Sequence, residues 1–254
     1  MANPVFRNSK SFQQGTPVGF EAPSAPGFTP IDDRMTYDGT IAKAASLFLL
    51  ATASALLVGM LMPALAMPLM IVGFVLALIV MFTTRNGPKP ALMATTIAVY
   101  GGAVGGISVY YEASFGGIIL QSLIGTAVVF AVSLLVYRSG RIRNMAKVNR
   151  FLMIAAPAYV IFSLINVAMV SFGGFNMRDV QIGGTGVNVN LGLILSLFAI
   201  TVGAFMLISD FDFVANGVRN GLPAKWEWTA AYGLVFAIIW IYLEMLRLMG
   251  YLRR

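Results

Sequence analysis

The sequence predicts an all-α membrane protein, a bundle of seven transmembrane helices. Three observations favour this class. Of the 254 residues, 58% are hydrophobic and only 11% are charged, whereas a soluble domain of this size needs a far more polar surface. The mean hydropathy is +0.82. Seven apolar segments are each long enough to cross ~30 Å of hydrocarbon as a helix.

The expected helices follow one another along most of the chain. Residues 1–40 are polar and rich in Pro, Gly and Ser, so we expect a flexible cytoplasmic tail there and a membrane domain over residues 41–254. Pro63 and Pro68 flank a tight first connection, and "RNGPKP" is a clear break after the second segment. The expected spans are 41–62, 65–84, 91–111, 117–137, 151–172, 191–214 and 229–250.

The basic residues predict the orientation. The 85–90, 138–150 and 215–228 loops carry most of the Arg and Lys, and they alternate with connections that carry Glu112 alone or Arg178 beside Asp179. By the positive-inside rule, the N-terminus is expected in the cytoplasm and the C-terminus outside a plasma membrane. The net charge of +7 is then explained by topology, and no nucleic-acid partner is expected.

The C-terminal end leaves an alternative open. Arg253 and Arg254 depart mildly from the rule, so a re-entrant last segment with the C-terminus inside remains an alternative to seven full spans.

The residue types exclude several kinds of chemistry. Without cysteine or histidine, the chain has no disulfide, no thiol nucleophile, no histidine switch and few routes to a zinc site. We therefore expect no enzyme and no bound cofactor. Any response to pH must come from carboxylates, which titrate near neutrality only when burial or a like charge raises the pKa.

The third segment contains "GGAVGG", in which Gly101 lies one turn before Gly105 and Gly102 one turn before Gly106. Small residues at four-residue spacing allow two helices to cross closely. The pattern predicts a packing contact rather than a cofactor site.

Few ionisable residues fall within or at the ends of the expected spans. They include Asp210, Asp212, Glu244, Arg247 and Arg85, and such residues are functional candidates by default. Asp210 and Asp212 are separated by about 200° around a helix, so only one can face the bundle. Asp210 is expected near the cytoplasmic rim, where both could also be solvated end residues. Glu244 and Arg247 are spaced for a local ion pair.

Several segments together resemble one family. The seven apolar segments, "GISVYY" with "ILQSLIGTAVVFAVSLL", "SDFDFV" ending the sixth segment and "YLEMLRLMG" closing the seventh resemble the Bax inhibitor (transmembrane Bax inhibitor motif, YccA-like) family over residues 41–251. The form with a long tail resembles a bacterial, actinobacterial-type branch. The resemblance implies a bundle around a central last helix, and a pH-sensitive calcium leak.

The resemblance also implies roles for particular residues. Asp210 matches the family's aspartate at the end of helix six, with Ser209 in place of the usual Tyr, and Arg85 lies at or beside its arginine counter-charge. The family's second aspartate, in helix seven, aligns with Ala237. A paired-aspartate gate is therefore incomplete here; Asp212 or Glu227 could substitute, and Glu244 lies about 10 Å further along the same face as Ala237.

Two functions follow as expectations. The first is a pH-sensitive calcium or cation leak channel or transporter in the lipid bilayer. It would bind Ca²⁺ transiently, with Asp210, Arg85 and Asp212 as gating or ion-contact residues and Glu244 and Glu227 as secondary candidates. The alternative is a non-conducting membrane regulator that binds a membrane protease or another membrane partner through residues 1–40 and the loops.

Overall fold

A computed structural model describes residues 34–84, 87–142, 144–184 and 187–253. Seven helices in this part are long and apolar enough to cross a membrane, which confirms the predicted fold class. The elements are α2 (Tyr37–Leu61), η2 (Pro63–Leu65), α3 (Ala66–Thr83), α4 (Pro90–Ser114), α5 (Ile118–Arg138), α6 (Met145–Gly173), η4 (Met177–Asp179), β1 (Gln181–Gly184), β2 (Val187–Asn190), α7 (Leu191–Arg219), η5 (Ala224–Trp226) and α8 (Glu227–Leu252).

Several helix ends lie outside the predicted spans, by the most residues at the starts of α2 and α6 and the end of α7. The first helix begins at Tyr37, because Thr36 caps it by accepting a hydrogen bond from the Gly39 amide. The sixth span continues to Arg219, because Gly217 on its last turns still packs against Met35. Asp210 is therefore about 13 Å before the end of α7. Most of the predicted tail, residues 1–33, is outside the described residues.

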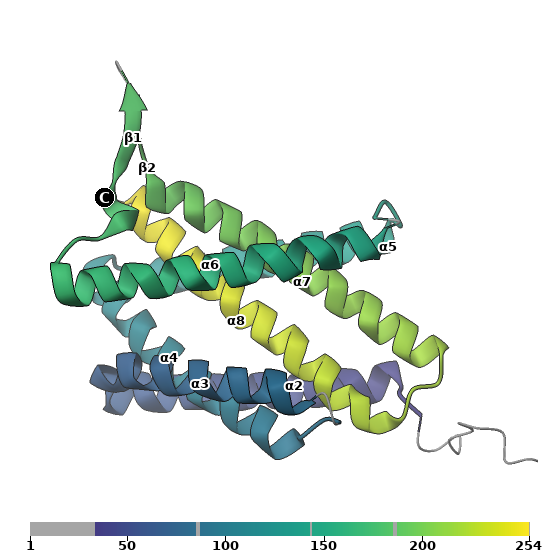
Figure 1. Cartoon of the computed structure of the whole chain (residues 1–254). Helices are drawn as coiled ribbons and strands as arrows, with labels where there is room; N and C mark the ends of the chain where they lie inside the picture. Colours follow the sequence, from purple (N-terminus) through teal and green to yellow (C-terminus); the bar gives the residue numbers. More distant parts are fainter. Residues whose placement is uncertain (1–33, 85–86, 143, 185–186, 254) are drawn as a thin grey trace, which may run out of the picture.

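The last helix is central, as the family resemblance implies. α8 packs against α2, α4, α5 and α7, and Figure 1 draws it diagonally through the bundle. Its side chains Val235, Tyr242 and Leu246 belong to the largest core cluster, together with Leu47 of α2 and Ile97 of α4. α7 and α8 also lie side by side along much of their length.

The glycines of α4 form the predicted close crossing. A Cβ on Gly101 would collide with the carbonyl oxygen of Ala51, and one on Gly105 with that of Ala55, both on α2. A Cβ on Gly106 would lie 2.7 Å from the carbonyl oxygen of Pro63. The backbones of α2 and α4 are therefore in direct contact, which only glycine permits.

The connection between α6 and α7 contains ordered structure that the sequence did not predict. It holds η4 and an antiparallel pair of strands, β1 and β2, with Gln181 opposite Asn190. Figure 1 shows this hairpin projecting beyond one end of the bundle. Asn190 then caps α7 by accepting a hydrogen bond from the Gly192 amide at 2.7 Å.

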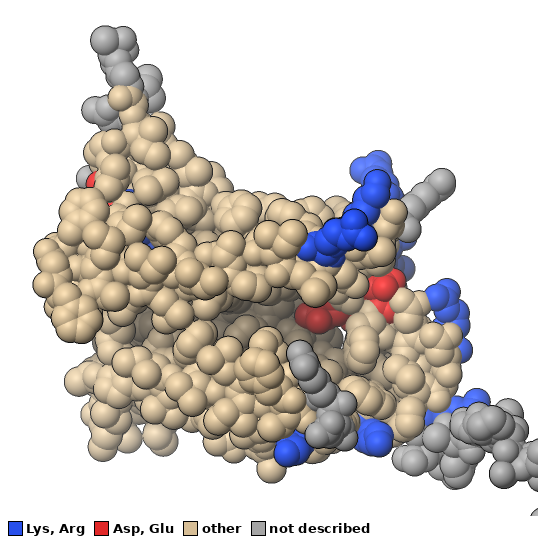
Figure 2. All heavy atoms as spheres, in the orientation of Figure 1, with Lys and Arg blue, Asp and Glu red and all other residues tan. Residues whose placement is uncertain are grey.

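The two ends of the bundle differ in charge. At the end where α8 begins, the described residues include nine basic and four acidic side chains, whereas the opposite end has three of each. Figure 2 shows most of the blue atoms at the first end. The chain reaches the second end at its C-terminus (Figure 1), and α8 is continuous over its whole length, so the re-entrant alternative is not what the structure adopts.

Arg253 has a local explanation in spite of its departure from the charge rule. Its guanidinium donates hydrogen bonds to the carbonyl oxygens of Phe115 and Gly116, at 3.2 and 2.8 Å. In the same connection, Glu112 accepts hydrogen bonds from the amides of Gly117 and Ile119 at the start of α5. These contacts satisfy backbone groups that a helix end leaves unpaired.

Candidate functional site

Asp210 lies in the seam between α7 and α8, opposite a glycine. A Cβ added to Gly233 of α8 would be 2.7 Å from Oδ1 of Asp210. The carboxylate thus occupies space that any other residue at position 233 would fill. The side chain is partly buried. Figure 2 shows acidic atoms in a hollow of the surface, near the end of the bundle that carries most of the basic residues.

The Asp210 carboxylate forms no hydrogen bond or ion pair with the residues that the structure describes. Its neighbour Ser209 donates a hydrogen bond to Asn149 of α6 at 2.8 Å. An unpaired carboxylate inside a membrane helix is costly. Its presence therefore needs a reason other than stability.

Asp212 is directed elsewhere, as its spacing from Asp210 predicts. It accepts a hydrogen bond from Asn216 at 2.8 Å, and Asn216 in turn accepts one from Arg219. This carboxylate has its hydrogen-bond partner on its own helix, and the structure does not bring it to Asp210.

The seam next to Asp210 is closed by apolar side chains. Leu207, Ala237 and Ile241 form one buried cluster, and each is at most 2% exposed. Ala237 is the residue aligned with the family's second aspartate, and it packs here as a small apolar residue. No second carboxylate therefore faces Asp210 at this level of α8.

Arg85, the predicted counter-charge, is outside the described residues. The helix before it, α3, ends at Thr83 and packs against α4. The pairing of Arg85 with Asp210 stays a prediction.

Glu227 contacts residues at the start of α2 and not Asp210. It is 4% exposed, lies 2.5 Å from Nζ of Lys43, and accepts hydrogen bonds from the amide and hydroxyl of Thr36 at 2.8 and 3.1 Å. It holds the start of α2 against the start of α8. In the structure, this secondary candidate therefore connects two helices.

Glu244 lies near the other end of α8, in an ionic cluster. Arg247 donates a hydrogen bond to its Oε1, which confirms the predicted local pair. Arg178 of η4 also approaches, with Nη1 3.9 Å from Oε2 of Glu244. The sequence predicts Arg178 only as a charged residue in a loop. The 173–190 segment is polar and rich in glycine, and this composition does not distinguish a buried arginine from a solvated one.

The comparison with known families agrees with this architecture. A family model described as Bax inhibitor 1 like matches residues 3–254. The chain belongs to this family. A search of curated protein sequences finds no significant match.

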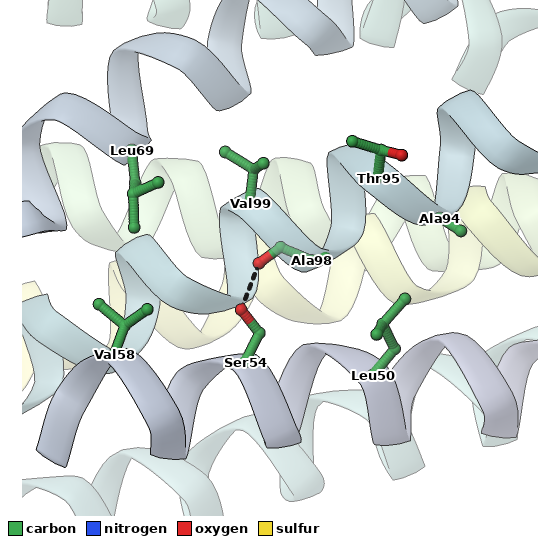
Figure 3. Close-up of a pocket in the computed structure, with 8 residues that line it drawn as sticks. All are labelled: Leu50, Ser54, Val58, Leu69, Ala94, Thr95, Ala98 and Val99. Carbon is green, nitrogen blue, oxygen red and sulfur yellow. Dashed lines mark hydrogen bonds between the residues drawn. The ribbon is translucent and has the colours of Figure 1, made fainter. Parts of the chain in front are cut away.

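Two pockets of this Bax inhibitor 1 like protein are lined mainly by apolar side chains. One of about 460 Å³ lies between α2, α3 and α4, and Figure 3 shows its walls and the hydrogen bond that Ser54 donates to the Ala98 carbonyl at 2.6 Å. Another of about 610 Å³ lies among α2, α4, α5 and α8. Neither is lined by Asp210 or Glu244, so neither offers an ion a charged contact.

The carboxylates of this family member do not gather into a metal centre. Within the described residues, no group of three or more acidic side chains could hold a metal ion. A cation that met Asp210 would have one carboxylate and would keep most of its water, since Ca²⁺ takes six to eight oxygen ligands. Such a site would bind a cation only briefly.

Proposed function

We propose that this protein is a pH-modulated cation leak of the plasma membrane, with Ca²⁺ as the cation and Asp210 as its gate and ion contact. One observation carries the proposal. Asp210 is a carboxylate in a helix–helix seam of a membrane bundle, without a hydrogen bond or ion pair among the described residues. Such residues mark ion paths, proton relays or charge sensors.

The apolar seal beside Asp210 supports a closed form. Leu207, Ala237 and Ile241 form a buried apolar cluster between α7 and α8, and a hydrophobic constriction blocks ions by excluding water. Opening would require α7 and α8 to separate over about two turns. A leak needs only a small population of such an open form.

Arg85 is proposed as the charge that Asp210 binds in the closed form. Protonation of Asp210 removes the negative charge, releases Arg85 and shifts the balance towards the open form. The leak should therefore increase as the pH falls. The match of Arg85 to the family's arginine supports this assignment, together with its position two residues after the end of α3.

The charge asymmetry supports the proposed orientation. The end of the bundle with nine basic residues among those described is the one that the positive-inside rule assigns to the cytoplasm. Asp210 would then be nearer the cytoplasmic side, and Glu244 nearer the outside.

The test is calcium flux into proteoliposomes across a range of pH. The wild type should admit Ca²⁺ faster than protein-free vesicles, and faster in acid. Asp210→Asn should give flux that no longer depends on pH. Unchanged flux and an unchanged pH response in this variant would overturn the proposal.

A further inference from the structure

The seam between α7 and α8 has a second charged locus beyond the apolar seal. Glu244 is 2% exposed, and it lies eleven positions after Gly233 on α8, or about 16 Å along the helix. The buried Leu207–Ala237–Ile241 cluster lies between the two levels. A carboxylate is thus present on each side of the seal.

Two guanidinium groups cover Glu244. Arg247 comes from the next turn of α8 and is partly exposed, whereas Arg178 comes from η4 and is buried. With one carboxylate and two guanidiniums, the cluster has a formal charge of +1 and would repel a cation.

Arg178 is held by α6 more tightly than by Glu244. Its Nη2 donates hydrogen bonds to the hydroxyls of Tyr159 and Ser163 at 2.7 and 3.1 Å. Its guanidinium lies 5.3 Å from the centroid of the Tyr159 ring and 5.8 Å from that of Phe162, a cation–π arrangement. Arg178 therefore links α6, through η4, to α8.

The contact between Arg178 and Glu244 is incomplete. Within the described residues, neither Nη1 of Arg178 nor Oε2 of Glu244 has a hydrogen bond, and both atoms are buried. Buried ion pairs with poor geometry stabilise a fold less than apolar side chains of the same size. Because Arg178 is on a short 3-10 turn, its withdrawal from Glu244 would not require a membrane helix to unwind.

We propose that Glu244 is a second cation contact on the same path, and that Arg178 is a tethered cation that occupies it in the closed form. The proposal rests on the proposed leak and adds an outer gate to it. When Arg178 moves away, Glu244 keeps one guanidinium, the formal charge of the cluster falls to zero, and a mobile cation can replace the lost one.

Two substitutions that each remove one charge test the gate, because they should change calcium flux in opposite directions. Arg178→Gln should raise calcium flux several-fold, whereas Glu244→Gln should lower it, because the first uncovers the carboxylate and the second removes it. Arg253→Gln, an exposed arginine at the same end, serves as control and should leave flux unchanged. A purely structural link predicts the same direction for both substitutions, and that result would overturn the gate.

A labelling experiment tests Glu244 without conduction. Because the chain has no cysteine, Ser163→Cys introduces a single thiol beside Arg178. In the Arg178→Gln background, a cationic methanethiosulfonate reagent should react with this thiol several-fold faster than an anionic one of similar size. Adding Glu244→Gln should abolish that preference. Equal rates for the two reagents would overturn the cation contact.

The two experiments separate the two proposals. If labelling shows the charge preference and no variant conducts, the leak is wrong and Glu244 still attracts cations. If the wild type conducts and labelling shows no preference, the leak stands and the outer gate is wrong. Should Arg178→Gln fail to fold, Arg178→Ala in the labelling assay replaces it, with the same expected preference.

Discussion

Asp210 and Gly233 form the residue pair on which the account depends. Because Gly233 has no Cβ, the facing helix leaves room for the Asp210 carboxylate. A side chain at position 233 would fill that space. The family's second aspartate is replaced by Ala237, one turn further along α8, which packs in the apolar seal. The proposed gate at Asp210 therefore has one carboxylate at this level of α8 rather than a pair.

Gly233→Ala tests this pair. Its Cβ would be 2.7 Å from Oδ1 of Asp210, so the carboxylate must shift. We expect the pH dependence of calcium flux to change while the protein still folds, since Ala favours a helix over Gly by roughly 1 kcal/mol. Gly173→Ala, at a site with no heavy atom within 4 Å, is the control. A flux–pH curve identical to that of the wild type would contradict the assignment.

Glu227 is predicted to matter for stability rather than gating. Glu227→Gln removes the charge that binds Lys43 and weakens two hydrogen bonds from Thr36. The free energy of unfolding should fall by about 1–3 kcal/mol, because a buried polar group loses its partners. Thermal unfolding in detergent measures this, and Asp38→Asn, an exposed change at the same end, should have a smaller effect. A Glu227→Gln variant that loses the pH response of calcium flux but keeps its stability would contradict this interpretation.

At the scale of elements, the α2–α4 crossing depends on glycine. Gly105→Val places a branched side chain against the Ala55 backbone. We expect a loss of at least ~1–3 kcal/mol, the usual cost of overpacking, and a lower midpoint of thermal unfolding. A midpoint equal to that of the wild type would contradict the described crossing.

The helices were predictable from the sequence, and much of their packing was not. Length and hydropathy define seven spans, and the "GGAVGG" spacing predicts a close crossing, but it does not say that α2 is the partner. The end of α7 was missed because Met35, the residue that buries Gly217, is distant in sequence.

The candidate site shows the same limit. Helical geometry separates Asp210 from Asp212, but only the fold places Gly233 opposite the first of them. Arg178 was missed because its burial depends on Tyr159 and Ser163 of α6. A loop arginine has no local pattern that reports such long-range contacts.

At the scale of the whole molecule, the bundle is polarised. Nine of the described basic residues are at one end, and Figure 2 shows most of the blue atoms at that end, with acidic atoms in a hollow nearby. In the proposed orientation, Asp210 experiences the cytoplasmic pH and Glu244 is nearer the outside. The leak would therefore respond to acidification of the cell interior.

Single cysteines test this orientation. Ser139 and Ser114 are both exposed serines, at the basic and the opposite end respectively, and the chain contributes no other thiol. In intact cells, a membrane-impermeant maleimide should label Ser114→Cys and spare Ser139→Cys until the cells are opened. Labelling of Ser139→Cys alone in intact cells would contradict the proposed orientation.

The most direct test of the central claim is calcium flux into proteoliposomes, measured from alkaline to acidic pH for the wild type, Asp210→Asn and Asp212→Asn. The two variants remove the same charge from the same helix, but Asp210 faces α8 and Asp212 bonds to Asn216. The account predicts that flux rises with acid in the wild type and in Asp212→Asn, and is independent of pH in Asp210→Asn. A pH response that survives in Asp210→Asn and disappears in Asp212→Asn would contradict it.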